Sequence, residues 1–132
     1  MFVVEATSCR AATIAEGVGF AGVWSSGRSI SAVLGLRDNN EASWTQIVDV
    51  VEFMADAGDL PILLDGDTGF GNFNNVRRLV RKPEQRGVAG VCIEDKPFPT
   101  AHSFLDGEGQ PLAEHDEVGG RPKAERAARA DP

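Results

Sequence analysis

The sequence has little cysteine, and positive charge is in short supply. Only two cysteines occur among its 132 residues, Cys9 and Cys92. They lie in apolar surroundings without CxxC spacing, which predicts buried, reduced thiols and argues against a disulfide or a metal role. Lysine and arginine number 13 against 20 acidic residues, for a net charge of −7. This balance argues against binding to nucleic acid or to an anionic membrane surface, because both require a positive field.

Long hydrophobic runs are also missing. No segment approaches the roughly 18 consecutive apolar residues of a membrane span. The opening Met-Phe-Val-Val-Glu shows no basic stretch followed by a long apolar one, so no secretory signal is expected. Apolar residues make up 42% of the chain and charged residues 25%, as in an ordinary globular domain. We therefore expect a cytoplasmic protein with one hydrophobic core.

Short apolar runs alternate with longer amphipathic ones, a pattern typical of repeated βα units. The runs are apolar throughout, which predicts parallel strands that are covered on both faces. Four such units fit an open doubly wound sheet or the first half of an eight-fold (β/α) barrel of the TIM type, and composition does not choose between them. The expected strands cover residues 2–6, 20–24, 61–65 and 89–94.

The clearest predicted helix lies between the second and third strands. Apolar residues recur there at helical spacing over residues 44–54. Asn39 or Asn40 is expected to cap its start. Ser8 is expected to cap an earlier helix that runs to about residue 18. The remaining expected helices cover residues 30–34 and 72–85.

A long loop follows the fourth strand, and structureless loops of more than about 12 residues inside a compact domain are usually functional lids or disordered. We assign residues 1–112 to the half-barrel. Residues 113–132 form a basic tail that is either helical or disordered. Gly119, Gly120 and Pro122 are expected to interrupt any helix there.

Acidic residues follow the strands at the ends where parallel βα folds bind ligands. Asp65 and Asp67 are two residues apart, so they are expected to project to the same side. Glu94 ends the neighbouring strand, about 4.8 Å away. Carboxylates this close need a cation to stay ionised together, and oxygen ligands favour Mg²⁺. The alternative is that these acids cap helices or are solvated.

Three other segments near the strand ends are ambiguous by themselves. Residues 25–27 (Ser-Ser-Gly) can donate hydrogen bonds to an oxyanion or form a plain turn. Asp38 is a candidate nucleophile or phosphate-facing carboxylate, or else a helix cap. Residues 68–72 (Thr-Gly-Phe-Gly-Asn) match neither GxGxxG nor a Walker motif, so nucleotide binding has little support.

Taken together, these segments resemble the phosphoenolpyruvate mutase family of the isocitrate lyase superfamily. The resemblance implies a (β/α)₈ barrel, of which about the first four units are present. It also implies a Mg²⁺-dependent isomerase that interconverts phosphoenolpyruvate and phosphonopyruvate, the step of phosphonate biosynthesis that forms the carbon–phosphorus bond. The matching segments are residues 24–27 (Trp-Ser-Ser-Gly), 37–44 (Arg-Asp-Asn-Asn-Glu-Ala-Ser-Trp), 65–72 (Asp-Gly-Asp-Thr-Gly-Phe-Gly-Asn) and 94–96 (Glu-Asp-Lys).

The resemblance also implies roles for individual residues. Asp65 would hold Mg²⁺, with Asp67 and Glu94 acting largely through bound waters. Asp38 would face the transferring phosphoryl group, as its acceptor or as a stabiliser. The residues expected to line or flank the substrate pocket are Trp24, Ser26, Gly27 and Arg28.

The sequence departs from the family in the loop after the fourth strand. The family carries a lysine and an asparagine there, and this chain has Thr100 and His102. The difference keeps two alternatives open, a phosphonopyruvate hydrolase and a catalytically inactive remnant. In each case the expected ligand is a small molecule. A homo-oligomer is expected if the half-barrel folds, because four strands leave open sheet edges.

Overall fold

The computed structural model describes residues 2–99 and 113–128. Its four parallel strands form one sheet in the order β1 (Val3–Glu5), β2 (Gly22–Ser25), β3 (Ile62–Asp65) and β4 (Gly90–Cys92). Each strand pairs with the next one in the sequence, so the order never reverses as it does in a doubly wound sheet. This is the order of a (β/α) barrel. The helices are α1 (Cys9–Val18), α2 (Gly27–Val33), α3 (Trp44–Asp56), α4 (Phe73–Gln85) and α5 (His115–Ala128).

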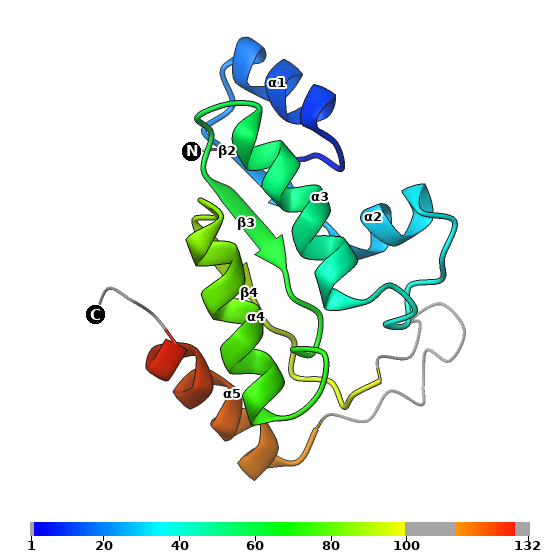
Figure 1. Ribbon diagram of the computed structural model, residues 1–132, viewed down its shortest axis with the longest axis vertical. Coiled ribbons are helices and arrows are strands. Elements are labelled where there is room, and N and C mark those ends of the chain that lie inside the picture. Colours follow the sequence, from blue (N-terminus) through cyan, green and yellow to red (C-terminus); the bar gives the residue numbers. More distant parts are fainter. Residues whose placement is uncertain (1, 100–112, 129–132) are drawn as a thin grey trace.

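The hydrophobic core lies between the sheet and the helices that cover one of its faces. Figure 1 shows α3 and α4 side by side in front of the sheet, with α5 beside α4. Val23, Ile62 and Leu64 alternate with residues of the opposite face, so they point toward these helices. The fully buried side chains of α3 that join them in the core are Ile47, Val48, Val51 and Met54.

The other face of the sheet is uncovered in the described residues. Val3 is 47% exposed and Leu63 is 41% exposed. The prediction that both faces are covered is therefore wrong for this inner face. Cys92 pairs with Asp65 on the same face and is exposed, and Cys9 is exposed at the start of α1. Neither cysteine forms a disulfide, but the prediction that they are buried is wrong, because the apolar context gave no indication of which face they lie on.

Side-chain caps explain where the helices begin. Ser8 caps α1 as predicted, because its hydroxyl accepts a hydrogen bond from Ala11 N. The start of α3 is capped by Ser43, which forms a reciprocal capping box with Gln46. The assignment of that cap to Asn39 or Asn40 is wrong, since the chain between them and the helix forms a separate turn.

The tail contains one uninterrupted helix, α5, although Gly119, Gly120 and Pro122 lie inside it. The expected interruption is wrong. Packing of α5 against α4 outweighs the poor local propensity, as tertiary contacts often do in short helices. No helix in the described parts of the chain is long and apolar enough to cross a membrane.

Candidate functional site

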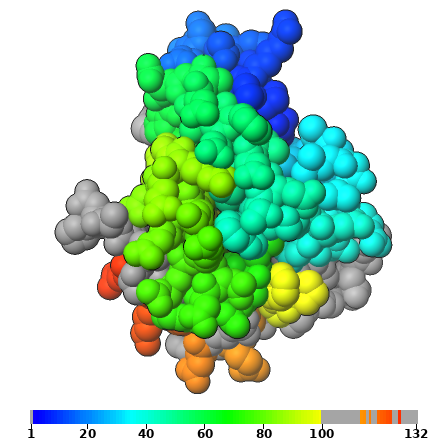
Figure 2. Space-filling view, viewed as in Figure 1, coloured from blue at the N-terminus to red at the C-terminus, as the bar shows by residue number. Residues whose placement is uncertain are grey.

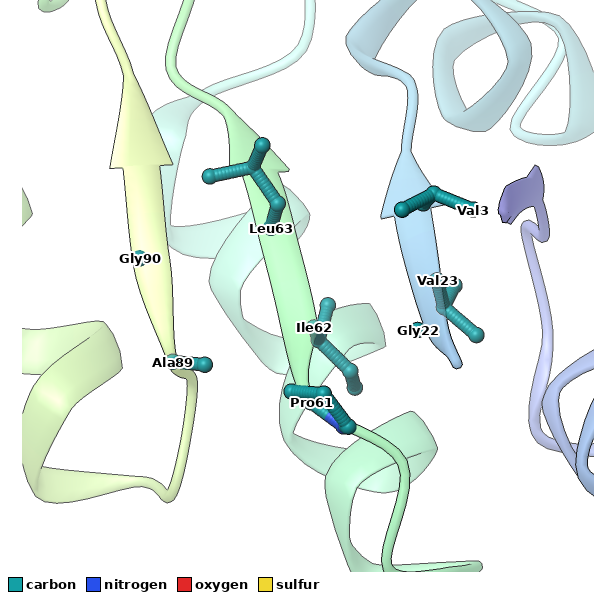
Figure 3. A pocket seen from close by; sticks show the side chains of 8 residues that line it. All are labelled: Val3, Gly22, Val23, Pro61, Ile62, Leu63, Ala89 and Gly90. Atoms are coloured by element: carbon teal, nitrogen blue, oxygen red, sulfur yellow. The ribbon is translucent and has the colours of Figure 1, made fainter. Parts of the chain in front are cut away.

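The two ends of the sheet differ in chemistry. At the amino ends of the strands lies a pocket without a single charged side chain in its lining (Figure 3). In parallel βα barrels the amino-terminal face serves stability, and the active site lies at the carboxyl ends of the strands. The candidate site is therefore the opposite end, where the acidic residues gather. The pocket at the amino ends is lined by Val3, Gly22, Val23, Pro61, Ile62, Leu63, Ala89 and Gly90.

Asp65 and Asp67 converge on the first turn of α2. Asp65 Oδ2 accepts a hydrogen bond from Gly27 N at 3.2 Å, and Asp65 Oδ1 accepts one from Asp67 N at 3.1 Å. A Cβ atom placed on Gly27 would lie 3.5 Å from Asp67 Oδ2 and 3.6 Å from Asp65 Oδ2. The missing side chain of Gly27 thus leaves open the space in front of both carboxylates.

The electrostatics of this pair show that negative charge is concentrated here. Burial, together with the nearby charges of Asp65, Asp38 and Glu94, raises the pKa of Asp67 to about 7. Burial also raises the pKa of Asp65, with smaller contributions from Glu94 and Asp38, although hydrogen bonds from Asp67 N and Gly27 N oppose the increase. The four acids therefore act on one another through space.

Glu94 is joined to the site through its backbone. Its amide donates a hydrogen bond to Asp67 O at 2.6 Å. Its carboxylate lies 3.1 Å from Lys96 Nζ, an ion-pair contact without hydrogen-bonding geometry, so the buried Oε2 atom has no hydrogen-bond partner. Within residues 2–99 and 113–128, no three His, Cys, Asp or Glu side chains form a group arranged to hold a metal. Glu94 is thus close to the pair without completing a ligand set.

Asp38 lies in the loop between α2 and α3, half-buried beside this cluster. Glu41 closes the turn around Asp38, because its carboxylate accepts hydrogen bonds from Arg37 N at 2.8 Å and Arg37 Nε at 3.1 Å. The loop is tied to the cluster by Asn40, whose Nδ2 donates to Asp67 Oδ2 at 3.2 Å. Asp38 caps no helix here, since Ser43 takes that role.

The predicted pocket residues occupy different settings. Trp24 is half-buried on the inner face of β2, paired with Leu63. Ser26 is buried and caps α2 by accepting a hydrogen bond from Ser29 N at 3.4 Å. Arg28 is exposed, one residue beyond Gly27. The predicted lid residues Thr100 and His102 lie outside the described residues.

The surface around the strand ends brings distant segments together. Figure 2 shows the segment just after β4, in yellow, next to the green surface of the β3–α4 region and below the teal surface near the start of α3. These are the segments that carry Lys96, Asp67 and Asn40. The loops therefore meet at one rim, as parallel βα folds require.

The donor atoms of the acidic cluster suit a hard divalent cation, although the three side chains are not arranged as a ligand set in the described residues. The side chains of Asp65, Asp67 and Glu94 offer only carboxylate oxygens, which Mg²⁺ prefers. Glu94 Oε2 has no hydrogen-bond partner and the pKa of Asp67 is raised, which indicates concentrated negative charge beside the ion pair with Lys96. The place where Gly27 lacks a Cβ atom lies directly against the oxygens of Asp65 and Asp67.

Three contacts of the site were not anticipated from the sequence. They are the Asn40–Asp67 hydrogen bond, the Lys96–Glu94 ion pair and a bond from Arg121 Nη1 to Glu94 O at 2.5 Å. The Glu-Asp-Lys run was a usable signal for the ion pair, since it places a cation next to the acids. Nothing in the sequence pointed to Arg121, which lies in the tail and is only 5% exposed.

Comparisons with known proteins agree with this geometry. The model of the family described as phosphoenolpyruvate phosphomutase matches residues 1–132. The chain is 56% identical over 123 residues to phosphoenolpyruvate phosphomutase from Tetrahymena pyriformis, covering 93% of this chain and 41% of the relative. The chain thus spans less than half the length of that relative.

Two solved structures are similar over nearly the whole chain. The structure of phosphoenolpyruvate phosphomutase from Streptomyces platensis subsp. rosaceus has a TM-score of 0.93 and 44% identity, over 98% of this chain and 45% of that one. A phosphonopyruvate hydrolase complex with oxalate and Mg²⁺ has a TM-score of 0.86 and 34% identity, over 98% of this chain and 43% of that one. The barrel-type fold predicted from the sequence is confirmed.

Proposed function

The chain belongs to the phosphoenolpyruvate phosphomutase family, and on that premise we propose that the protein interconverts phosphoenolpyruvate and phosphonopyruvate. The reaction belongs to phosphonate biosynthesis, and the substrate is a small molecule. The observation that carries the proposal is the convergence of Asp65 and Asp67 on the first turn of α2, with the carboxylate of Asp38 close enough to raise the pKa of both.

Mg²⁺ is the proposed cofactor, held by Asp65 with help from Asp67 and Glu94. When bound, the ion would neutralise negative charge on the substrate oxygens and orient them. The solved hydrolase complex that resembles this chain contains Mg²⁺ together with oxalate. In this chain the carboxylate oxygens supply the matching hard ligands.

The remaining residues of the rim would bind and orient the substrate. Trp24 offers an apolar wall from the inner face of β2. Gly27 leaves room for the substrate carboxylate, and the exposed Arg28 supplies a positive charge at the edge of the pocket. Ser26, buried beneath them, keeps the first turn of α2 in place. Together they would hold a small dianionic substrate against the acids.

Asp38 is the proposed catalytic residue. In the direction that forms the carbon–phosphorus bond, the phosphoryl group leaves the enol oxygen of phosphoenolpyruvate and is transferred to the methylene carbon of the same molecule. A carboxylate facing that group can accept it or stabilise it in transit. The Arg37–Glu41 contacts, which close the turn on both sides of Asp38, would hold this carboxylate at a fixed place.

The experiment follows phosphorus by NMR. Phosphonopyruvate is incubated with the purified chain and Mg²⁺, and phosphoenolpyruvate is the product that supports the proposal. Free phosphate would instead indicate the hydrolase, and no product would indicate an inactive remnant. Asp38→Ala and Asp65→Ala should abolish turnover. Asp56→Ala is the matched control, because Asp56 is exposed at the end of α3, away from the site.

The uncovered inner face of the sheet supports a second part of the proposal. Leu63 and Val3 leave apolar surface exposed on this face. We propose that a second copy of the chain covers it, so that the protein is a homo-oligomer. Mass measurement by light scattering tests this, and a monomer would contradict it. We propose a cytoplasmic location, where the thiols of Cys9 and Cys92, which form no disulfide, would stay reduced.

A further inference from the structure

Asn40 connects two parts of the rim that come from different regions of the chain. Its amide Nδ2 donates a hydrogen bond to Asp67 Oδ2 at 3.2 Å, in a partly buried position. Asn40 lies two residues after Asp38, and Asp67 lies two residues after Asp65. The bond therefore joins the loop that carries the proposed catalytic carboxylate to the turn that carries the proposed metal ligands.

The backbone at both ends of this bond is unusual. Asn40 has φ of 62° and Asp67 has φ of 46°, both in the left-handed region that non-glycine residues rarely adopt. Asparagine and aspartate tolerate this region better than other residues with a side chain. Such conformations persist only where surrounding contacts fix them, and they often occur at functional sites. Here the hydrogen bond between Asn40 and Asp67 is one of the contacts that fix the backbone of both residues.

The chemistry of the amide suits this position. Asp67 lies near the like charges of Asp65, Asp38 and Glu94. A neutral N–H donor can orient this carboxylate without adding negative charge. Unlike a cationic side chain, it does not compete with the metal for the carboxylate. Groups that hydrogen-bond a metal-binding carboxylate orient it, and their loss typically costs 10–100-fold in metal affinity or activity.

We propose that Asn40 is a positioning residue that couples Mg²⁺ binding at Asp65 and Asp67 to the placement of the Asp38 loop. The inference rests on the proposed function, because it takes these carboxylates as the metal site. In this role Asn40 would act through Asp67 without contacting the metal or the substrate. Its amide sets where Asp67 points, and in return Asp67 keeps the turn of residues 37–41 against the rim.

Three variants separate the amide from the backbone. Asn40→Gly keeps the left-handed backbone accessible and removes the amide. Asn40→Asp keeps the shape but replaces the donor with a repelling oxygen. Asn39→Ala is the matched control in the same turn, and it leaves the Asn40 amide in place. If only the backbone matters, Asn40→Gly should behave like the wild type.

The first measurement uses the metal-free chain and follows hydrogen exchange in residues 37–41. We expect faster exchange in Asn40→Gly and Asn40→Asp, and wild-type exchange in Asn39→Ala. Equal exchange in all four proteins would overturn the inference. This readout does not involve Mg²⁺, so it stands apart from the proposed metal site.

The second measurement is calorimetric titration with Mg²⁺, combined with hydrogen exchange at saturation. We expect about tenfold weaker binding for Asn40→Gly and still weaker binding for Asn40→Asp. We also expect Mg²⁺ to slow exchange of residues 37–41 in the wild type but not in Asn40→Gly. Equal affinities for Asn40→Gly and the wild type would overturn the coupling while leaving the metal site intact. Absence of Mg²⁺ binding by the wild type would contradict the metal site itself.

Discussion

Lys96 Nζ lies 3.1 Å from Glu94 Oε2, so the protein supplies a positive charge of its own at the edge of the acidic cluster. The same ammonium group lowers the pKa of Asp67, against the four influences that raise it. An internal cation at this position competes electrostatically with any metal that binds the acids.

Lys96→Met is therefore expected to bind Mg²⁺ more tightly than the wild type, by about fivefold, since losing one nearby like charge at a partly exposed site is worth about 1 kcal/mol. Calorimetric titration at fixed ionic strength measures the change. Lys82→Met is the control, because Lys82 lies at the end of α4 and its ammonium group donates a hydrogen bond to Gln85 and not to an acid of the site. Unchanged or weaker binding in Lys96→Met would contradict competition between the ammonium group and the metal.

The raised pKa of Asp67 predicts how stability depends on pH. A carboxyl whose pKa rises from 3.8 to about 7 on folding binds its proton more tightly in the folded state. The folded, metal-free chain should therefore lose stability as pH rises from about 4 to 7, with a change of about 2 kcal/mol between pH 5.5 and 8. Urea unfolding at several pH values measures it.

Asp67→Asn isolates this contribution, because asparagine does not titrate. Its stability should vary less with pH than that of the wild type over the same range. Saturating Mg²⁺ should stabilise the wild type more at pH 8 than at pH 5.5, since the metal needs the ionised form. Identical pH profiles for the wild type and Asp67→Asn would show that Asp67 titrates in its ordinary range.

Gly27 offers a test of the space in front of the carboxylates. A methyl group there would meet Asp65 and Asp67 oxygens at ordinary van der Waals distances. Gly27→Ala should fold with unchanged or slightly higher stability, because alanine is favoured in helices by up to about 1 kcal/mol. It should nevertheless bind oxalate in the presence of Mg²⁺ about tenfold more weakly than the wild type, since the methyl occupies the ligand's space.

The control for this variant is Gly17→Ala in α1, where an added methyl meets nothing within 4 Å. It should gain similar stability and keep wild-type oxalate binding. Thermal unfolding and calorimetry provide the two readouts. Equal oxalate affinities for Gly27→Ala and Gly17→Ala would show that oxalate does not bind next to Gly27.

Arg121 makes the tail part of the site. It is buried, and its guanidinium group donates to Glu94 O at the end of β4. Arg121→Met should lose about 2–3 kcal/mol of unfolding free energy, as expected for a buried hydrogen bond from a charged group. Arg126→Ala, an exposed arginine of the same helix, should change stability by less than about 0.5 kcal/mol. Similar losses in both variants would show that α5 contributes only general packing.

The sequence predicted the repeating parts of this structure better than the contacts between them. The strands, α1 and α4 follow from apolar runs and, for α1, from the Ser8 cap, all of which act within a few residues. The cap of α3 was misassigned because Asn39, Asn40 and Ser43 are all good capping residues, and only the path of the chain selects one.

The site was predictable in its strand-end acids but not in its connections. The spacing of Asp65 and Asp67 and the parallel strands bring those two side chains to one edge. In contrast, the Asn40 bond joins residues 27 positions apart, and Arg121 reaches back 27 positions to Glu94. Neither pairing leaves a periodic pattern. The uncovered inner face was also missed, because an apolar strand does not indicate whether another layer lies against it.

The proposed chemistry requires that Asp65, Asp67 and Glu94 bind one divalent cation at the rim. Anomalous diffraction from crystals of the chain grown with Mn²⁺, which takes oxygen ligands as Mg²⁺ does, tests this most directly. We expect a single anomalous peak at Asp65, between the turn that carries Asp67 and the end of β4, with Glu94 turned away from Lys96. A peak elsewhere on the protein, or no peak at a Mn²⁺ concentration that saturates binding in solution, would contradict it.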